Sequence, residues 1–189
     1  MARAESGVGR TELASLDLGA VAADVVDLYE PVAEERGLTM VAAIDSGAVL
    51  LGNRQLLAQA IANLVDNAIK YTPSGGTISL SIESEPSFVR LTVSDNGPGI
   101  APADRGRVLE RFVRIGHDPA VSGSGLGLSL VAAVARLHRA TLELGDNGPG
   151  LRVTLIFPTA PSAFKPSELP RPEPEIEQRP AVKPAIANT

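Results

Sequence analysis

The sequence contains no cysteine and no tryptophan, and aromatic residues make up only 3% of its 189 residues. Without cysteine the chain has neither a disulfide framework nor a thiolate metal site. With so few aromatic side chains, the core must be built from Leu, Val, Ile and Ala. The formal net charge of −5 lacks the basic excess that is typical of nucleic-acid-binding proteins. We therefore expect a globular cytoplasmic protein that binds no nucleic acid.

Long apolar runs are also missing. No stretch approaches the roughly 20 apolar residues that span a bilayer. Residues 1–10 (MARAESGVGR) lack the apolar core of a secretory signal. We expect no direct membrane segment in this chain, which still allows it to be the cytoplasmic part of a membrane-anchored protein.

Composition divides the chain into three parts. Residues 1–10 have the pattern of a flexible lead, and residues 11–158 have the mixed apolar and polar pattern of one folded domain. Residues 159–189 are rich in proline, with isolated apolar side chains. Such a segment cannot bury enough apolar surface to offset the entropy lost on ordering it. We predict that it is a disordered, partly polyproline-like tail.

Within the domain, the spacing of apolar residues predicts three helices and several short strands. The helices are expected over residues 18–36, 53–71 and 125–139. The strands are expected over residues 11–18, 38–44, 48–51, 77–83, 88–94, 141–144 and 151–157. The residues of the third helix that are expected to face the core are Leu126, Leu130, Val134 and Leu137. Residues 101–124 combine short helical pieces with a Gly- and Ser-rich segment.

The rest of the chain is organised around the helix over residues 53–71. Three of its polar residues, Asn63, Asn67 and Lys70, form a stripe at the edge of its apolar arc, because residues three or four apart share a face. An amide oxygen can complete a Mg²⁺ shell beside phosphate oxygens, and the ammonium supplies a point charge for phosphates. The alternative is an ordinary solvated helix face.

A second motif, DNGPG, begins at Asp95, directly after an apolar strand. A carboxylate at a strand end can accept a hydrogen bond from an exocyclic amine such as that of adenine. Gly97 and Gly99 allow the backbone to approach a flat ring closely. The alternative is a β-turn without function, since Asp, Asn, Gly and Pro are common turn residues.

Two further motifs follow. Residues 123–128 (GSGLGL) lead into the third helix, where free backbone N–H groups and the helix dipole favour a phosphate; the alternative is a flexible loop. Arg111 and Arg114 flank Phe112, which can anchor a mobile loop to the core, while either arginine can reach a phosphate. The alternative there is an ordinary amphipathic turn.

The two histidines, His117 and His138, have no partners at metal-ligand spacing in the sequence. We expect both to be surface or packing residues. No serine stands in a nucleophile-elbow pattern.

Together, in this order and spacing, these motifs resemble those of the catalytic ATP-binding domain of bacterial sensor histidine kinases, a superfamily shared with gyrase B, Hsp90 and MutL. Residues 63–71 (NLVDNAIKY) resemble the N box, and residues 95–100 (DNGPGI) the first glycine box. Arg111, Phe112 and Arg114 resemble the F box, and residues 123–128 the second glycine box. The resemblance covers residues 12–158. The F box and the Lys-Tyr pair that ends the N box favour the kinase branch.

This resemblance implies a two-layer α/β sandwich of the Bergerat type, in which a mixed sheet is packed by three helices. It implies ATP and Mg²⁺ as cofactors, with ATP between the central helix and a lid of residues 101–124. By resemblance, Asn67 holds the metal, and Asn63 and Lys70 are the catalytic residues on the phosphate side. The remaining residues implied to bind ATP are Tyr71, Asp95, Gly97, Gly99, Ile100, Arg111, Arg114, Gly123, Ser124, Gly125, Leu126, Gly127 and Leu128.

The sequence departs from the family pattern in three places. Asn53 stands where the family often has Asp, and either residue is a good N-cap. Residues 150–153 read GLRV where the family often has Gly-Thr-x-Phe, so a threonine hydroxyl that could reach adenine through water is absent. Finally, only residues 1–10 precede the first expected strand, which leaves no room for the helical hairpin that carries the phosphoacceptor histidine.

We therefore expect a Mg-ATP-binding kinase domain that does not autophosphorylate by itself. It would donate the γ-phosphate to a histidine on a dimerisation domain in trans, with a response regulator as a further partner. One alternative is a non-catalytic ATP-sensing interaction module. Another is a serine kinase of the anti-sigma type, which has a related fold.

Overall fold

The computed structural model describes residues 12–113 and 125–159. Its helices and strands follow one another in the order β1 (Ala14–Asp17), α1 (Leu18–Glu35), β2 (Thr39–Ile44), β3 (Val49–Gly52), α2 (Arg54–Tyr71), β4 (Thr77–Glu85), β5 (Phe88–Asp95), the 3-10 helices η1 (Pro102–Asp104) and η2 (Arg107–Leu109), α3 (Gly127–Leu137), β6 (Thr141–Asp146) and β7 (Leu151–Pro158). The predicted parts 1–10 and 159–189 lie almost wholly outside the described residues, so that division of the chain stays a prediction.

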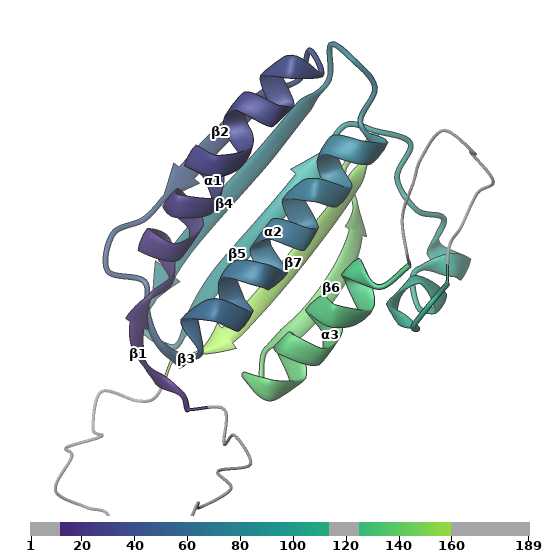
Figure 1. Ribbon diagram of the computed structural model, residues 1–189. Coiled ribbons are helices and arrows are strands. Elements are labelled where there is room, and N and C mark those ends of the chain that lie inside the picture. Colours follow the sequence, from purple (N-terminus) through teal and green to yellow (C-terminus); the bar gives the residue numbers. More distant parts are fainter. Residues whose placement is uncertain (1–11, 114–124, 160–189) are drawn as a thin grey trace, which may run out of the picture.

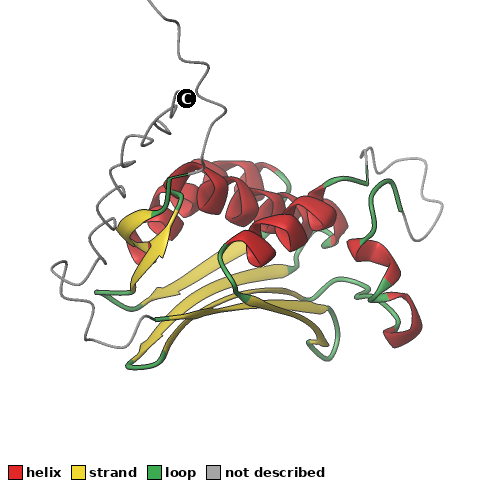
Figure 2. Ribbon diagram, turned by 90° about the horizontal axis from the view of Figure 1, so that it is seen from below, coloured by secondary structure: helices red, strands yellow, loops and turns green. Residues whose placement is uncertain are grey.

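The larger sheet has five strands in the order β2-β4-β5-β7-β6. β2 and β4 run parallel, and the other neighbouring strands are antiparallel. Helices α1, α2 and α3 all lie on one face of this sheet (Figures 1 and 2). The predicted two-layer α/β sandwich with a mixed sheet and three helices is therefore confirmed.

The alternation of residues along β4 explains why only one face of the sheet is covered. Ile78, Leu80 and Ile82 are buried against the helices, whereas Ser79 and Ser81 point to the opposite face. This pattern of apolar residues on one face and polar residues on the other is typical of a sheet with one solvated side. The core consequently lies between the sheet and the helix layer.

Helix α2 crosses the middle of the sheet, as the spacing of its apolar residues predicted. Its buried residues are Leu57, Ala60, Ile61, Leu64, Val65, Ala68 and Ile69. The helix begins after Asn53, whose side-chain oxygen accepts the Leu56 N–H at 3.0 Å and so caps the first turn. It ends at Tyr71, because Thr72 is extended and Pro73 follows. This end places the polar stripe of α2 beside the end of β5.

His138 links the end of α3 to the start of α2. Its Nε2 accepts the Asn53 N–H at 3.0 Å, and its Nδ1 donates to the Val134 carbonyl at 2.8 Å. The ring is 6% exposed and meets the ring of Phe157 edge to face at 6.2 Å. The prediction of a packing role for His138 is confirmed.

Two details of the predicted core are wrong. Leu126 and Leu137 are 38% and 41% exposed, although both were expected to face inward. α3 begins at Gly127, so Leu126 precedes the first turn and Leu137 is the final helical residue. Val134 is buried, as predicted, and the other buried residues of this helix are Ser129, Val131, Ala132 and Ala135.

In the described parts of the chain, none of the helices combines the length and the apolar character needed to cross a bilayer.

Candidate nucleotide-binding site

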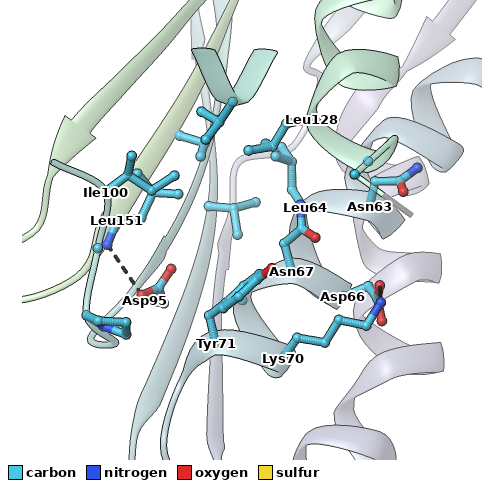
Figure 3. Close-up of a pocket in the computed structure, with 18 of the residues that line it drawn as sticks. Asn63, Leu64, Asp66, Asn67, Lys70, Tyr71, Asp95, Ile100, Leu128 and Leu151 are labelled. Carbon is cyan, nitrogen blue, oxygen red and sulfur yellow. Dashed lines mark hydrogen bonds and ion pairs between the residues drawn. The ribbon is translucent and has the colours of Figure 1, made fainter. Parts of the chain in front are cut away.

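A pocket opens where α2, the end of β5 and the start of α3 converge. It is lined by Asn63, Leu64, Asp66, Asn67, Ala68, Lys70, Tyr71, Val93, Asp95, Pro98, Gly99, Ile100, Val108, Val113, Gly125, Gly127, Leu128, Leu151 and Val153. Figure 3 shows Asp95 on one side of this pocket and Asn63 and Asn67 on the other. The lining is mostly apolar with a few polar groups that converge, as is usual for small-molecule sites.

The polar stripe of α2 forms one wall. Asn63, Asn67 and Lys70 are all half-buried and lie within the lining. Asn63 donates from its amide to the Gln59 carbonyl at 2.8 Å, which leaves its Oδ1 free to face the pocket. Within the described residues, the Asn67 carboxamide makes no hydrogen bond to protein. It is therefore available to a ligand.

Gly127, the first residue of α3, faces this wall. A Cβ atom at Gly127 would lie 3.3 Å from Asn63 Oδ1 and 3.3 Å from Asn67 Nδ2. The absence of a side chain lets the start of α3 approach both carboxamides closely. Backbone N–H groups at this helix start and the polar wall of α2 consequently meet in one corner of the pocket.

Asp66 is a pocket residue that the sequence analysis missed. It forms an ion pair with Lys70, one turn further along α2, and both line the pocket. The acidic residue lies inside the N-box segment, so its spacing of four from Lys70 was a usable signal. Burial, followed by the charge of Asp66, raises the pKa of the Tyr29 phenol of α1, and the charge of Lys70 opposes that rise.

Asp95 forms the opposite wall. Asp95 is 7% exposed. Its Oδ1 accepts the Gly97 N–H at 2.9 Å and the Leu151 N–H at 3.3 Å (Figure 3). Burial raises the pKa of Asp95 above its ordinary value of 3.8, and these two N–H donors oppose that rise. Among the described residues, Oδ2 has no hydrogen-bond partner, so one acceptor oxygen is left for a ligand donor.

The glycines of the first glycine box fit tightly between neighbouring backbones. A Cβ at Gly97 would lie 2.8 Å from the Tyr71 carbonyl oxygen. At Gly99 it would lie 2.7 Å from the Gly150 carbonyl oxygen, and Gly99 has a φ of +69°. Gly99 lines the pocket, whereas Gly97 supports it from behind by holding the Asp95 carboxylate.

The structure brings together most, but not all, of the residues named from the sequence. Those in the lining are Asn63, Asn67, Lys70, Tyr71, Asp95, Gly99, Ile100, Gly125, Gly127 and Leu128. Arg111 and Leu126 are described but do not line the pocket. Arg114, Gly123, Ser124 and His117 lie outside the described residues.

Phe112 does not anchor its loop to the core, contrary to the prediction. It is 74% exposed, with a φ of +65°. Its N–H donates to the Gly125 carbonyl at 3.1 Å, so the backbone, not the ring, connects this segment to the second glycine box. Val108 and Val113 supply the apolar contacts of the same segment to the pocket.

The donor set fits a magnesium ion only if a ligand contributes oxygens. Across residues 12–113 and 125–159, no cluster of three or more His, Cys, Asp or Glu residues could hold a metal ion. The free carboxamide of Asn67 and the nearby oxygen of Asn63 are hard, neutral donors, which suit Mg²⁺ when phosphate oxygens complete its shell. The site therefore has the chemistry of a metal-nucleotide pocket and not of a metal site formed by protein alone.

The two-layer α/β fold and this pocket are together typical of nucleotide-binding ATPase domains. Comparison with known sequences assigns the chain to the same class. Residues 52–161 match the model of the family described as histidine kinase-, DNA gyrase B- and HSP90-like ATPase. The chain belongs to this family. Its relatives and structural neighbours place its domain among the catalytic ATPase domains of sensor histidine kinases, which confirms the predicted kinase branch.

Curated relatives include the sensor-like histidine kinase SenX3 of Mycobacterium tuberculosis (strain ATCC 25618 / H37Rv), which is 34% identical over 170 residues. That match covers 88% of this chain and 42% of SenX3. The histidine-protein kinase/phosphatase MprB of Mycobacterium ulcerans (strain Agy99) is 43% identical over 105 residues, which cover 55% of this chain and 20% of MprB. The chain thus spans less than half the length of these relatives.

Solved structures show the same fold. The mycobacterial sensor histidine kinase MprB superposes with a TM-score of 0.69 at 26% identity, over 77% of this chain and 97% of that one. Full-length ShkA in complex with AMPPNP superposes with a TM-score of 0.67 at 30% identity, over 78% of this chain and 32% of ShkA. The catalytic domain of ThkA, at 23% identity and a TM-score of 0.71, supports the fold alone.

Proposed function

We propose that this domain binds Mg-ATP and presents its γ-phosphate to a histidine on another segment or chain. The observation that carries the proposal is the pocket itself: the Asp95 carboxylate, with one free oxygen, faces the carboxamides of Asn63 and Asn67 across it. ShkA, a relative in structure, has been solved with the ATP analogue AMPPNP.

The two walls of the pocket have different proposed roles, one toward the base and one toward the metal and phosphates. Asp95 accepts a hydrogen bond from the adenine amine, and Tyr71, which is 45% exposed at the pocket edge, packs near the nucleoside. Asn67, with Asn63, holds Mg²⁺, which neutralises phosphate charge when bound. Lys70 contacts the phosphates, and the start of α3 closes this side. Such a site accelerates phosphoryl transfer by positioning and by charge stabilisation.

The acceptor must come from outside the described domain. Of the residues that the structure describes, His138 is the one histidine, and it is buried with both ring nitrogens in hydrogen bonds. We propose that the acceptor lies on a dimerisation domain and that a response regulator takes the phosphate next. Because ATP is the donor, we propose that the domain works in the cytoplasm, as part of a longer, membrane-anchored kinase or in trans to one.

A calorimetric titration with a non-hydrolysable ATP analogue, with and without Mg²⁺, tests the binding step. We expect Mg²⁺-dependent binding that is greatly weakened in both Asn67→Ala and Asp95→Ala. Arg90→Ala serves as a control, because Arg90 pairs with Glu83 on the sheet, away from the pocket. Binding that is unchanged in both pocket variants would refute the site.

Two other functions use the same pocket. A sensing module would bind ATP without transfer, and an anti-sigma-type kinase would phosphorylate serine. Incubation with labelled ATP and a histidine-containing dimerisation domain separates them. Acid-labile label on that domain supports the histidine kinase, acid-stable label on a serine supports the second, and binding without transfer supports the sensor.

A further inference from the structure

The turn between β6 and β7 forms hydrogen bonds with Asp95 at the end of β5. The Asn147 side chain donates from Nδ2 to the Asp95 backbone carbonyl at 2.8 Å. Four residues later, the Leu151 N–H donates to the Asp95 carboxylate at 3.3 Å. Gly150 packs so closely that a Cβ there would lie 1.8 Å from the Asp95 carbonyl oxygen. One turn thus holds both the main chain and the side chain of Asp95.

Arg152 determines which way the Asn147 amide faces. Its guanidinium donates to Asn147 Oδ1 at 2.9 Å, so the oxygen of the amide faces Arg152 and its nitrogen faces Asp95. If the amide were rotated by 180°, its NH₂ group would face the guanidinium N–H of Arg152, and its oxygen would face the carbonyl oxygen of Asp95. Neither pair of atoms can form a hydrogen bond. The turn is also closed on itself, because the Asn147 N–H donates to the Gly150 carbonyl at 3.1 Å.

Neither Asn147 nor Arg152 lines the pocket. They act on Asp95, whose carboxylate lines the pocket: Asn147 contacts its backbone carbonyl, and Arg152 contacts Asn147. A recognition group must be held within about 0.5 Å of its productive position to be effective. Gly97 fixes the carboxylate from its own loop, whereas, among residues 12–113 and 125–159, the Asn147 side chain of the β6–β7 turn is the one that holds the Asp95 backbone by a hydrogen bond.

We propose that Asn147, oriented by Arg152, is a positioning residue that sets the preference of this pocket for a 6-amino purine. This inference rests on the proposed function. An ionised carboxylate can only accept, so it favours a purine with an amine at position 6 over one with hydrogen or a carbonyl there. Loosening the turn weakens that one contact and leaves the contacts to sugar and phosphates in place.

The test compares two nucleotides that differ only at position 6: ATP and purine riboside triphosphate, which carries hydrogen there. We expect the wild-type protein to prefer ATP. In Asn147→Ala the affinity for ATP falls about fivefold, the factor for one hydrogen bond of about 1 kcal/mol, and the affinity for the purine analogue stays the same. Asn147→Asp removes the donor but keeps the acceptor for Arg152, and it gives the same pattern.

Substitutions of Arg152 provide a second test. Arg152→Ala lowers the ATP preference, Arg152→Lys retains most of it, and Arg90→Ala leaves it unchanged. Thermal melting of each variant reports folding separately. Equal losses for both nucleotides would assign Asn147 a structural role only and overturn the proposal, as would an unchanged ratio in Asn147→Ala and Asn147→Asp.

The failure of the inference differs from a failure of the proposed function. A wild-type protein that binds neither nucleotide overturns both. One that binds the two equally removes the adenine-reading role of Asp95, and the inference with it. A preference for ATP that survives every Asn147 and Arg152 variant overturns the inference alone.

Discussion

Asp66 and Lys70 form an ion pair across one turn of α2, and both side chains line the same pocket. The residue proposed to meet the phosphates therefore already has an anionic partner in the free protein. A ligand phosphate competes with Asp66 for the Lys70 ammonium and is repelled by the Asp66 carboxylate.

Asp66→Asn should therefore bind nucleotide more tightly when Mg²⁺ is absent. We expect a gain of about two- to fivefold, in line with about 0.5–1 kcal/mol for a partly exposed pair, measured by titration with ADP in EDTA. The gain should shrink in a Lys70→Ala background, since the freed ammonium accounts for part of it. A gain of the same size in both backgrounds would show that repulsion alone is responsible.

Gly127→Ala should separate binding from folding. The added Cβ displaces the carboxamides of Asn63 and Asn67, so Mg²⁺-dependent binding should weaken about tenfold, or about 1.4 kcal/mol. Stability should stay the same or rise by up to about 1 kcal/mol, because Ala favours a helix over Gly. Titration and thermal melting measure the two effects.

Two other glycines serve as controls for that substitution. Gly106→Ala meets no atom within 4 Å and should change neither property. Gly125→Ala is strained, because Gly125 has a φ of +69° and its Cβ would approach the Phe112 backbone to 3.0 Å, and it should reduce both. Normal metal-dependent binding in Gly127→Ala would contradict the placement of the metal beside Asn67.

His138→Ala should lower stability without changing nucleotide affinity. It leaves the partly buried Asn53 N–H without its acceptor and opens a cavity beside Phe157, which together cost about 2–4 kcal/mol. The pocket lies at the other end of α2. Denaturant unfolding measures the loss, and His138→Gln, whose amide oxygen can accept the same N–H, should lose less. Equal losses in the two variants would assign the effect to volume alone.

The sequence predicted the helices and strands because their apolar spacing is regular. α2 and β4 carry clear helical and alternating patterns, and the structure has both. Strand order was not predictable in this way, because the parallel pairing of β2 with β4 depends on contacts distant in sequence. Leu126 was wrongly predicted to be a core residue because the helical spacing of apolar residues extends one residue before the helix. That spacing does not show where the first turn begins.

Site residues were predictable from the sequence where they stand in motifs. Asn67 and Asp95 stand in motifs whose spacing has chemical meaning, and both line the pocket. Asn147 gave no such signal, because an Asn-Gly-Pro-Gly sequence in a hairpin is typical of an ordinary turn. Its hydrogen bond to Asp95, 52 residues away, exists only in the folded chain.

Asp95→Asn should lose the adenine contact and gain stability at neutral pH. Asparagine keeps an oxygen for the Gly97 and Leu151 N–H groups but carries no charge to bury. Since burial raises the pKa of Asp95 above 3.8, the folded wild-type holds the proton more tightly than the unfolded chain does. Its stability therefore falls as the pH rises from below 3.8 through the raised pKa, and this fall should be absent in Asp95→Asn when melting temperatures are compared across pH.

The same raised pKa predicts how binding depends on pH. A protonated Asp95 no longer offers an anionic acceptor to the amine, so ATP affinity should decline as the pH falls through that pKa, earlier than for an ordinary aspartate. Purine riboside triphosphate is the control, because its phosphates titrate as those of ATP do while its base lacks the amine. As the pH falls, the ratio of the two affinities should therefore fall more steeply in the wild-type protein than in Asp95→Asn, in which only protonation of the adenine ring itself remains. The same pH dependence of the ratio in the wild-type protein and in Asp95→Asn would mean that Asp95 does not contact the base.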